Sequence, residues 1–158
     1  MLSKKNRANI LVVDDSRLNI ERLNSILIDK YNVDFALSGE KALEIIVDNR
    51  PDLILLDIVM TGISGYEVCA ILKSNALTRD IPIIFVSSRG FAIDEVRAFE
   101  LGAVDYITKP VSAPVVNARV KAHLSYYYHQ VELEEKVELK TKEIYDTRLE
   151  IISKLSIA

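Results

Sequence analysis

The chain has 158 residues, of which 49% are hydrophobic and 27% are charged, and its formal net charge is −3. These values are typical of a soluble domain with a sizeable core, and they indicate no nucleic-acid or membrane-surface partner. The single cysteine, Cys69, excludes an internal disulfide framework and favours a reducing compartment. No apolar stretch has the length of a signal-peptide core or a membrane span, so we expect a cytoplasmic protein.

Over the first 112 residues the apolar pattern predicts short strands that alternate with helices. Strands are expected at 9–13, 32–36, 53–56, 81–86 and 105–108. Helices are expected from an N-cap at Ser16 to about residue 30, between Gly39 and Pro51, over 65–73, and over 94–101 before Gly102. This alternation indicates right-handed βαβ units, and therefore an α/β fold with a doubly wound, five-stranded parallel sheet of the flavodoxin-like kind.

The helical periodicity also predicts which side chains pack against the sheet. Residues three and four apart share one face of a helix, so each apolar stripe is expected to point inward. Cys69 lies on such a face, where we expect a plain packing role. The predicted inward residues are Leu18, Leu23, Ile26, Leu27, Ala42, Leu43, Ile46, Val47, Val68, Ile71 and Leu72.

From Ala113 to the end the chain changes character. This region has no glycine, its only proline is Pro114, and its seven basic and seven acidic residues cancel. A region without helix-breaking residues predicts one continuous helix, which would be far longer than average. An apolar stripe exposed along that helix needs a partner. We expect residues 113–158 to form one long helix that packs on the domain to about residue 125 and then dimerises in parallel; a tail folded back on its own domain is the alternative. Two coiled-coil-like sets with a break in phase support this: Val120, Leu124, Tyr127 and Val131, then Val137, Ile144, Ile151 and Leu155.

Polar residues follow four of the five predicted strands. They are Asp14 and Asp15, then Asp57, Ser87 and Lys109. Because the carboxyl ends of parallel strands share one edge of the sheet, these side chains are expected to converge. Three clustered carboxylates repel each other unless a divalent cation neutralises them, and oxygen ligands without His or Cys suit Mg²⁺. A lysine and a hydroxyl opposite the metal would hold a phosphoryl group, with an aspartate as its acceptor.

Four segments, VVDDS, LILLDIVMTGISGYEVC, PIIFVSS and GAVDYITKP, resemble the receiver domain of two-component response regulators, the CheY-like fold, over about residues 8–125. The resemblance implies that Asp57 is the phospho-acceptor. It also implies that Asp14 and Asp15 are the acidic pair that binds Mg²⁺, to which Val59 adds its backbone carbonyl. The phosphoryl donor would be a sensor histidine kinase or a phosphotransfer protein.

The resemblance also implies a switch. Ser87 would bond the phosphoryl group, Lys109 would pair with it, and Tyr106 would be the aromatic residue that moves when Ser87 is drawn in. The Lys109–Pro110 peptide is usually cis in this family. Phosphorylation adds close to two negative charges, which would repack residues 94–108 and change dimerisation.

Two residues depart from the family pattern. Thr61 stands where proline is usual, so the loop after Asp57 is expected to be less rigid. Ser88 replaces a common Ala or Gly and should narrow phosphoryl access only a little.

The tail resembles the linker that precedes HD-GYP cyclic di-GMP phosphodiesterase domains, since a TRLEII segment lies near its end. Linkers to diguanylate cyclases look similar, so that output stays an alternative. No HD or GYP motif occurs in the chain itself, which we expect to be a signalling receiver and not an enzyme.

Other classes fit the sequence less well. A haloacid-dehalogenase-like phosphatase needs a second aspartate at position 59, where Val59 stands. A flavodoxin-like cofactor binder needs a hydroxyl-and-glycine phosphate loop after the first strand, and none follows it here. The neutral tail offers no basic element to read DNA, and His123 and His129 are expected to be surface histidines. The open alternative of another class is an assembly module that keeps the fold without being phosphorylated.

Overall fold

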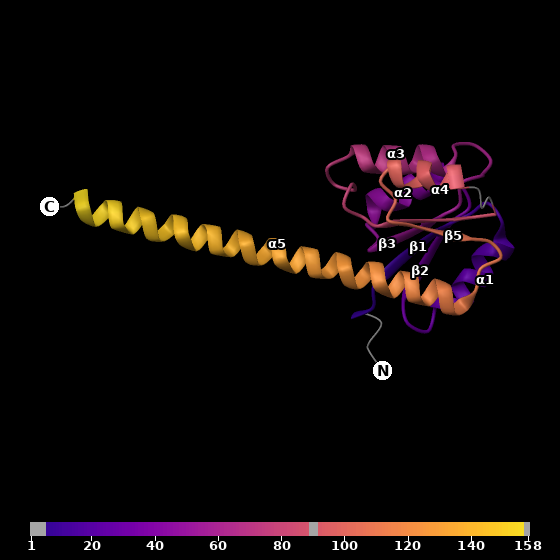
Figure 1. The fold of residues 1–158 in the computed structure, drawn as a ribbon, viewed down its shortest axis with the longest axis horizontal. Coiled ribbons are helices and arrows are strands. Elements are labelled where there is room, and N and C mark those ends of the chain that lie inside the picture. The colour runs from indigo at the N-terminus through magenta and orange to yellow at the C-terminus, as the bar shows by residue number, and fades with distance from the viewer. Residues whose placement is uncertain (1–5, 89–91, 157–158) are drawn as a thin grey trace. The chain divides into compact units, whose positions relative to one another are not determined.

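The computed structural model describes residues 6–88 and 92–156. Within these ranges the predicted strands and helices all form, in the predicted order (Figure 1). The elements are β1 (Asn9–Val13), α1 (Arg17–Leu27), β2 (Asn32–Ala36), α2 (Gly39–Asp48), β3 (Leu53–Leu56), α3 (Gly65–Ser74), β4 (Ile83–Ser87), α4 (Ala92–Glu100), β5 (Asp105–Thr108) and α5 (Ala113–Ser156).

The five strands form one parallel sheet in the order β2-β1-β3-β4-β5. This confirms the predicted α/β fold with a doubly wound sheet. Helices α2, α3 and α4 cover one face, while α1 and the first part of α5 cover the other (Figure 1). Because the order changes direction at β1 and β3, the loops that follow these two strands lie at the point where such sheets place their sites.

Alternation along the strands divides the core between the two faces. In β4, Phe85 packs in the cluster that includes the buried residues of α2 and α3, while Ile84 and Val86 pack in the cluster that includes α1 and α5. Successive strand residues point to opposite faces, so each inner strand needs apolar residues throughout. This explains the unbroken apolar runs that identified β1, β3 and β4.

Three predicted inward residues are in fact exposed, namely Leu18, Val47 and Ile71. Each lies about 100° or 200° around its helix from a fully inward neighbour, because successive residues turn by about 100°. Val47, for example, follows the buried Ile46 and is 85% exposed. Cys69 is buried and packs as predicted.

The end of α1 and the start of β4 differ by a few residues from the predictions. Helix α1 ends at Leu27 instead of about residue 30, because the Leu27 carbonyl already accepts from the backbone N–H groups of Lys30 and Tyr31 in a closing turn. Strand β4 begins after Pro82, which has no N–H to give to a sheet. Gly102 adopts a φ of +97°, a left-handed conformation that suits a glycine after α4.

Two compact units divide the chain, Met1–Leu124 and Ser125–Ala158. In the first, α5 buries Val116, Val120 and Leu124 against the sheet. In the second, α5 continues as a helix to Ser156, and residues 157–158 of the predicted helix lie outside the described residues. Within the described ranges, no helix is long and apolar enough to cross a membrane.

Candidate functional site

Three aspartates from two adjacent strands meet at the carboxyl edge of the sheet. Asp14 and Asp15 follow β1, and Asp57 follows β3. One carboxylate oxygen from each lies within 4.8 Å of the others. An all-oxygen set of this kind suits a hard divalent cation such as Mg²⁺, which keeps part of its hydration shell. The predicted convergence of the three carboxylates is therefore present in the fold.

Asp57 is a buried carboxylate, with 7% of its surface exposed. Burial raises the pKa of Asp57, and the neighbouring Asp14 raises it further, while Lys109 opposes both. A group whose charge is this poorly solvated gains from any cation placed beside it. The site therefore fits a metal ion on electrostatic grounds as well as by its ligand atoms.

Lys109 follows β5 and reaches both buried aspartates. Its Nζ donates to Asp14 Oδ2 at 2.6 Å and lies 3.4 Å from Asp57 Oδ2. Asp14 also accepts from the backbone N–H of Ser16 at 2.9 Å and from the Asn19 amide at 3.4 Å. The ammonium group thus contacts one member of the acidic pair, Asp14, as well as the predicted acceptor Asp57, and it screens the charges of both.

Asp15 is exposed, and the loop after β3 holds it. Its Oδ2 accepts from the Thr61 backbone N–H at 3.1 Å and from the Thr61 hydroxyl at 3.4 Å. The same loop is held from α2, where Glu40 accepts from the Ile63 N–H at 3.0 Å. The loop that carries Val59 is therefore anchored on both sides of the site, and the Val59 side chain is exposed.

Ser87 ends β4, and Tyr106, the second residue of β5, lies beside it. Ser87 is buried as the last residue of β4, and Ser88 after it is exposed. The Tyr106 ring is buried, and its hydroxyl makes no hydrogen bond of good geometry with any residue that the structure describes. Burial raises the pKa of Tyr106, and the adjacent Ser87 hydroxyl opposes that rise. The enclosed Tyr106 hydroxyl therefore lies beside Ser87, the residue that the resemblance assigns to the phosphoryl group.

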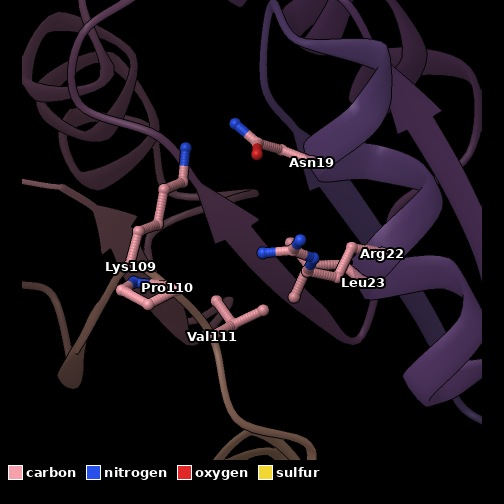
Figure 2. A pocket seen from close by; sticks show the side chains of 6 residues that line it. All are labelled: Asn19, Arg22, Leu23, Lys109, Pro110 and Val111. Atoms are coloured by element: carbon pink, nitrogen blue, oxygen red, sulfur yellow. The ribbon is translucent and has the colours of Figure 1, made fainter.

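A pocket opens beside Lys109 on the α1 side of the sheet. Figure 2 shows Asn19, Arg22 and Leu23 of α1 on one wall, facing Lys109, Pro110 and Val111 on the other. The Lys109–Pro110 peptide in this wall is cis, as the resemblance implied. Lys109 therefore borders this pocket as well as the acidic cluster.

Sequence reasoning missed several residues that support the site. Asn19, Glu40 and Thr61 hold the aspartates or their loop, and only their hydrogen bonds in the fold reveal this. The interpretation of His123 as a plain surface histidine is wrong, because its Nε2 lies 2.8 Å from Asp105 Oδ2 and three quarters of its side chain is buried. The partner is 18 positions away, on another element, which no local pattern could show.

Comparison with known proteins agrees with this geometry. The response regulator receiver domain family matches residues 10–121. The chain belongs to this family. It is a receiver domain of the two-component kind that continues into a long C-terminal helix, and receiver domains are signalling modules.

Relatives of the receiver include longer proteins. A Vibrio cholerae protein named "Probable cyclic di-GMP phosphodiesterase" is 48% identical over 118 residues, which are 75% of this chain and 27% of that protein. Response regulator PleD of Caulobacter vibrioides is 38% identical over 116 residues, which are 73% of this chain and 26% of that protein. The chain thus spans about a quarter of the length of these two relatives.

A solved structure shows the same fold. The signal receiver domain of a signal transduction histidine kinase from Syntrophus aciditrophicus matches with a TM-score of 0.69 and 37% identity, over 75% of this chain and 90% of that one. A quarter of this chain lies outside the matched share.

Proposed function

We propose that this receiver accepts a phosphoryl group on Asp57 from a sensor histidine kinase or a phosphotransfer protein when Mg²⁺ is bound. The observation that carries the proposal is the position of Lys109 Nζ, 2.6 Å from Asp14 and 3.4 Å from Asp57, beside three carboxylates whose ligand atoms lie within 4.8 Å. A cation-bridged acidic cluster around one buried aspartate is suited to phosphoryl transfer, in which catalysis is mostly positioning and charge stabilisation.

In the proposed reaction, an Asp57 carboxylate oxygen forms a bond to phosphorus. The bond between phosphorus and the donor breaks at the same centre, and its electron pair leaves with the imidazole nitrogen of a phosphohistidine or with the carboxylate of a small acyl phosphate. Lys109 stays close to Asp57 and so faces the charge that develops on the phosphoryl oxygens. Ser87, at the end of β4, is assigned the hydrogen bond to one of these oxygens.

The residues that would hold Mg²⁺ are Asp14, Asp15 and Asp57, together with the backbone carbonyl of Val59. When bound, the metal supplies positive charge that neutralises the carboxylates and the transferred phosphoryl group. Thr61 contributes by holding Asp15, and Ser16 and Asn19 contribute by holding Asp14. These bonds keep the acidic pair oriented before the metal arrives.

We further propose that phosphorylation acts through Tyr106. The enclosed Tyr106 hydroxyl lies beside Ser87, so movement of Ser87 toward a phosphoryl oxygen changes the space available to the ring. Strand β5 and helix α4 would then repack, because interiors are close-packed and respond to changes of one methyl group.

The distal part of α5 is assigned a role in assembly and output. From Leu133 to Leu155 it exposes a series of large apolar side chains, which a parallel helix from a second copy would cover. The division proposed is a receiver core over 1–112, a shared stretch of α5 to about 125, and a dimerising linker beyond it. The name of the Vibrio cholerae relative supports a cyclic di-GMP phosphodiesterase as the output, and a diguanylate cyclase stays the second candidate. A cytoplasmic location is supported by the single buried thiol of Cys69.

The test is intact-mass spectrometry after incubation with acetyl phosphate, with and without Mg²⁺. We expect a gain of one phosphoryl group that requires Mg²⁺ and is absent from an Asp57→Asn variant. A gain that persists in Asp57→Asn would place the acceptor elsewhere. No gain under any condition would favour the assembly module that works without phosphorylation.

A further inference from the structure

Asp105 precedes Tyr106, the proposed switch residue, on strand β5, and the two side chains point to opposite faces of the sheet. Tyr106 packs in the core cluster shared with α2 and α3, while Ile107 packs in the cluster shared with α1 and α5. Because strand side chains alternate, Asp105 points to the same side as Ile107, where it meets α5. A single peptide unit therefore separates the proposed switch from a side chain that contacts the C-terminal helix.

Four hydrogen bonds converge on this one buried carboxylate. Asp105 Oδ1 accepts from the Tyr106 backbone N–H at 2.8 Å and from Arg119 Nη1 at 2.7 Å. Its Oδ2 accepts from the same Arg119 nitrogen at 2.9 Å and lies 2.8 Å from His123 Nε2. Burial opposes ionisation, but the bonds from Arg119 and His123 hold the pKa of Asp105 below its usual value. An ionised carboxylate only accepts, so His123 Nε2 is the donor.

An apolar stripe also packs α5 against the sheet. Val116, Val120 and Leu124 are buried in the cluster that covers this face. Apolar burial is not directional, so it holds the helix against the sheet without defining its exact slide or rotation. Charge-assisted hydrogen bonds are directional and short, and Arg119 and His123 lie four residues apart on one face of the helix. Together they define the placement of α5 against β5.

We propose that Asp105, Arg119 and His123 couple the switch to α5, and that Arg119 is the positioning residue that registers the helix on β5. This inference rests on the proposed phosphorylation of Asp57. Asp105 Oδ1 accepts from both the Tyr106 backbone N–H and Arg119, so a displacement of the Tyr106 backbone moves this carboxylate. Helix α5 then follows the carboxylate, because Arg119 and His123, on successive turns of the helix, are both bonded to it. The network thus gives α5 a polar connection to the switch that its apolar face cannot provide.

The test uses the full chain with beryllium fluoride and Mg²⁺ as a stable mimic of the phosphorylated state. The variant is Arg119→Gln, which removes the charge but keeps a polar side chain. The matched control is Lys121→Gln, which removes a charge from an exposed position two residues along the same helix. The readout is hydrogen–deuterium exchange of α5, compared with and without the mimic, beside the mass gain from acetyl phosphate.

We expect wild type and Lys121→Gln to show the same mimic-dependent change in α5 exchange. In Arg119→Gln this mimic-dependent change in exchange should be smaller by about fivefold or more, because fivefold is the lower end of typical coupling between two sites. Its mass gain from acetyl phosphate should equal that of wild type, because Arg119 does not reach the acidic cluster. If Arg119→Gln fails to fold, Arg119→Lys replaces it, and a partial response is expected because lysine restores the charge.

Three results would overturn the coupling. One is an Arg119→Gln response equal to that of wild type. Another is an Arg119→Gln variant that melts at a lower temperature but keeps the wild-type ratio of α5 exchange with and without the mimic. In that case the bond would only stabilise the fold. The third is a wild type that gains the phosphoryl group while α5 exchange stays constant. A wild type without any mass gain would instead refute the proposed function, and the coupling with it.

Discussion

Thr61 holds Asp15 with two donors, its backbone N–H at 3.1 Å and its hydroxyl at 3.4 Å from Asp15 Oδ2. Asp15 is exposed, so without these bonds its carboxylate would be free to turn toward solvent. A proline at this position, which is usual among receivers, has no N–H to donate. In this chain the loop after Asp57 therefore orients one of the proposed metal ligands.

The Thr61–Asp15 contact predicts the effect of restoring proline. In Thr61→Pro we expect Mg²⁺ affinity to fall by about two- to fivefold, since a hydrogen bond to an exposed carboxylate contributes about 0.5–1 kcal/mol. Thr61→Ala keeps the N–H and serves as the control, with a smaller loss. Isothermal titration with Mg²⁺ measures both, and equal affinity for Thr61→Pro and wild type would show that Asp15 needs no support.

The raised pKa of Asp57 predicts a pH-dependent stability difference. In the folded state the proton is held more tightly than in the unfolded chain, so ionisation of Asp57 destabilises the metal-free protein as pH rises through its folded pKa. Asp57→Asn does not titrate and should therefore melt higher than wild type at neutral pH without Mg²⁺, by about 2–4 °C for each kcal/mol. Below the ordinary pKa of an aspartate the difference should disappear. Thermal unfolding across this range measures it, and a variant that melts lower at neutral pH would contradict the electrostatic account.

Lys109 predicts a stability effect that Mg²⁺ can reverse. Lys109→Ala leaves Asp14 and Asp57 buried without their cation, and removal of one partner from a buried pair is costly. We expect the metal-free variant to lose about 2–3 kcal/mol in urea unfolding, and Mg²⁺ to stabilise it by more than it stabilises wild type. Lys121→Ala, an exposed lysine, is the comparison. An equal gain from Mg²⁺ in both proteins would mean that the lysine and the metal do not share a role.

A tyrosine on α3 connects that helix to α4. The Tyr66 hydroxyl lies 3.3 Å from Asp94 Oδ1, the Arg97 guanidinium lies 4.3 Å above the ring, and the ring meets Phe85 edge-on. Tyr66→Phe keeps the ring contacts and removes the hydrogen bond, so we expect a loss of about 0.5–1 kcal/mol and faster hydrogen exchange in α4. Tyr126→Phe, which alters an exposed ring, should change neither quantity. Unchanged exchange in both variants would show that α4 does not depend on this bond.

How well the sequence predicted an element depended on whether its signal was local. Strands β1, β2, β3 and β5 have the predicted bounds, because apolar or alternating runs between turn residues leave few other solutions. The end of α1 was misplaced because a main-chain turn, which no side chain signals, closes it at Leu27. Residues at strand ends were predicted to converge from topology alone, and the structure brings Asp14, Asp15 and Asp57 together. His123 was misjudged because its partner Asp105 lies on another element, and the bonds from Thr61 to Asp15 were not foreseen for the same reason.

The backbone contact between Gly65 and Ile58 has a thermodynamic consequence for the loop between them. The Gly65 N–H donates to the Ile58 carbonyl at 2.8 Å, and a Cβ at position 65 would overlap the Asp57 carbonyl oxygen. The ends of this loop are thus joined in the folded protein. Closing a loop costs entropy that grows with its length, and here folding has already met that cost. Binding a cation at Val59 would therefore order only a few residues. It would lose less conformational entropy, and so less affinity, than binding to a loop whose ends are not joined.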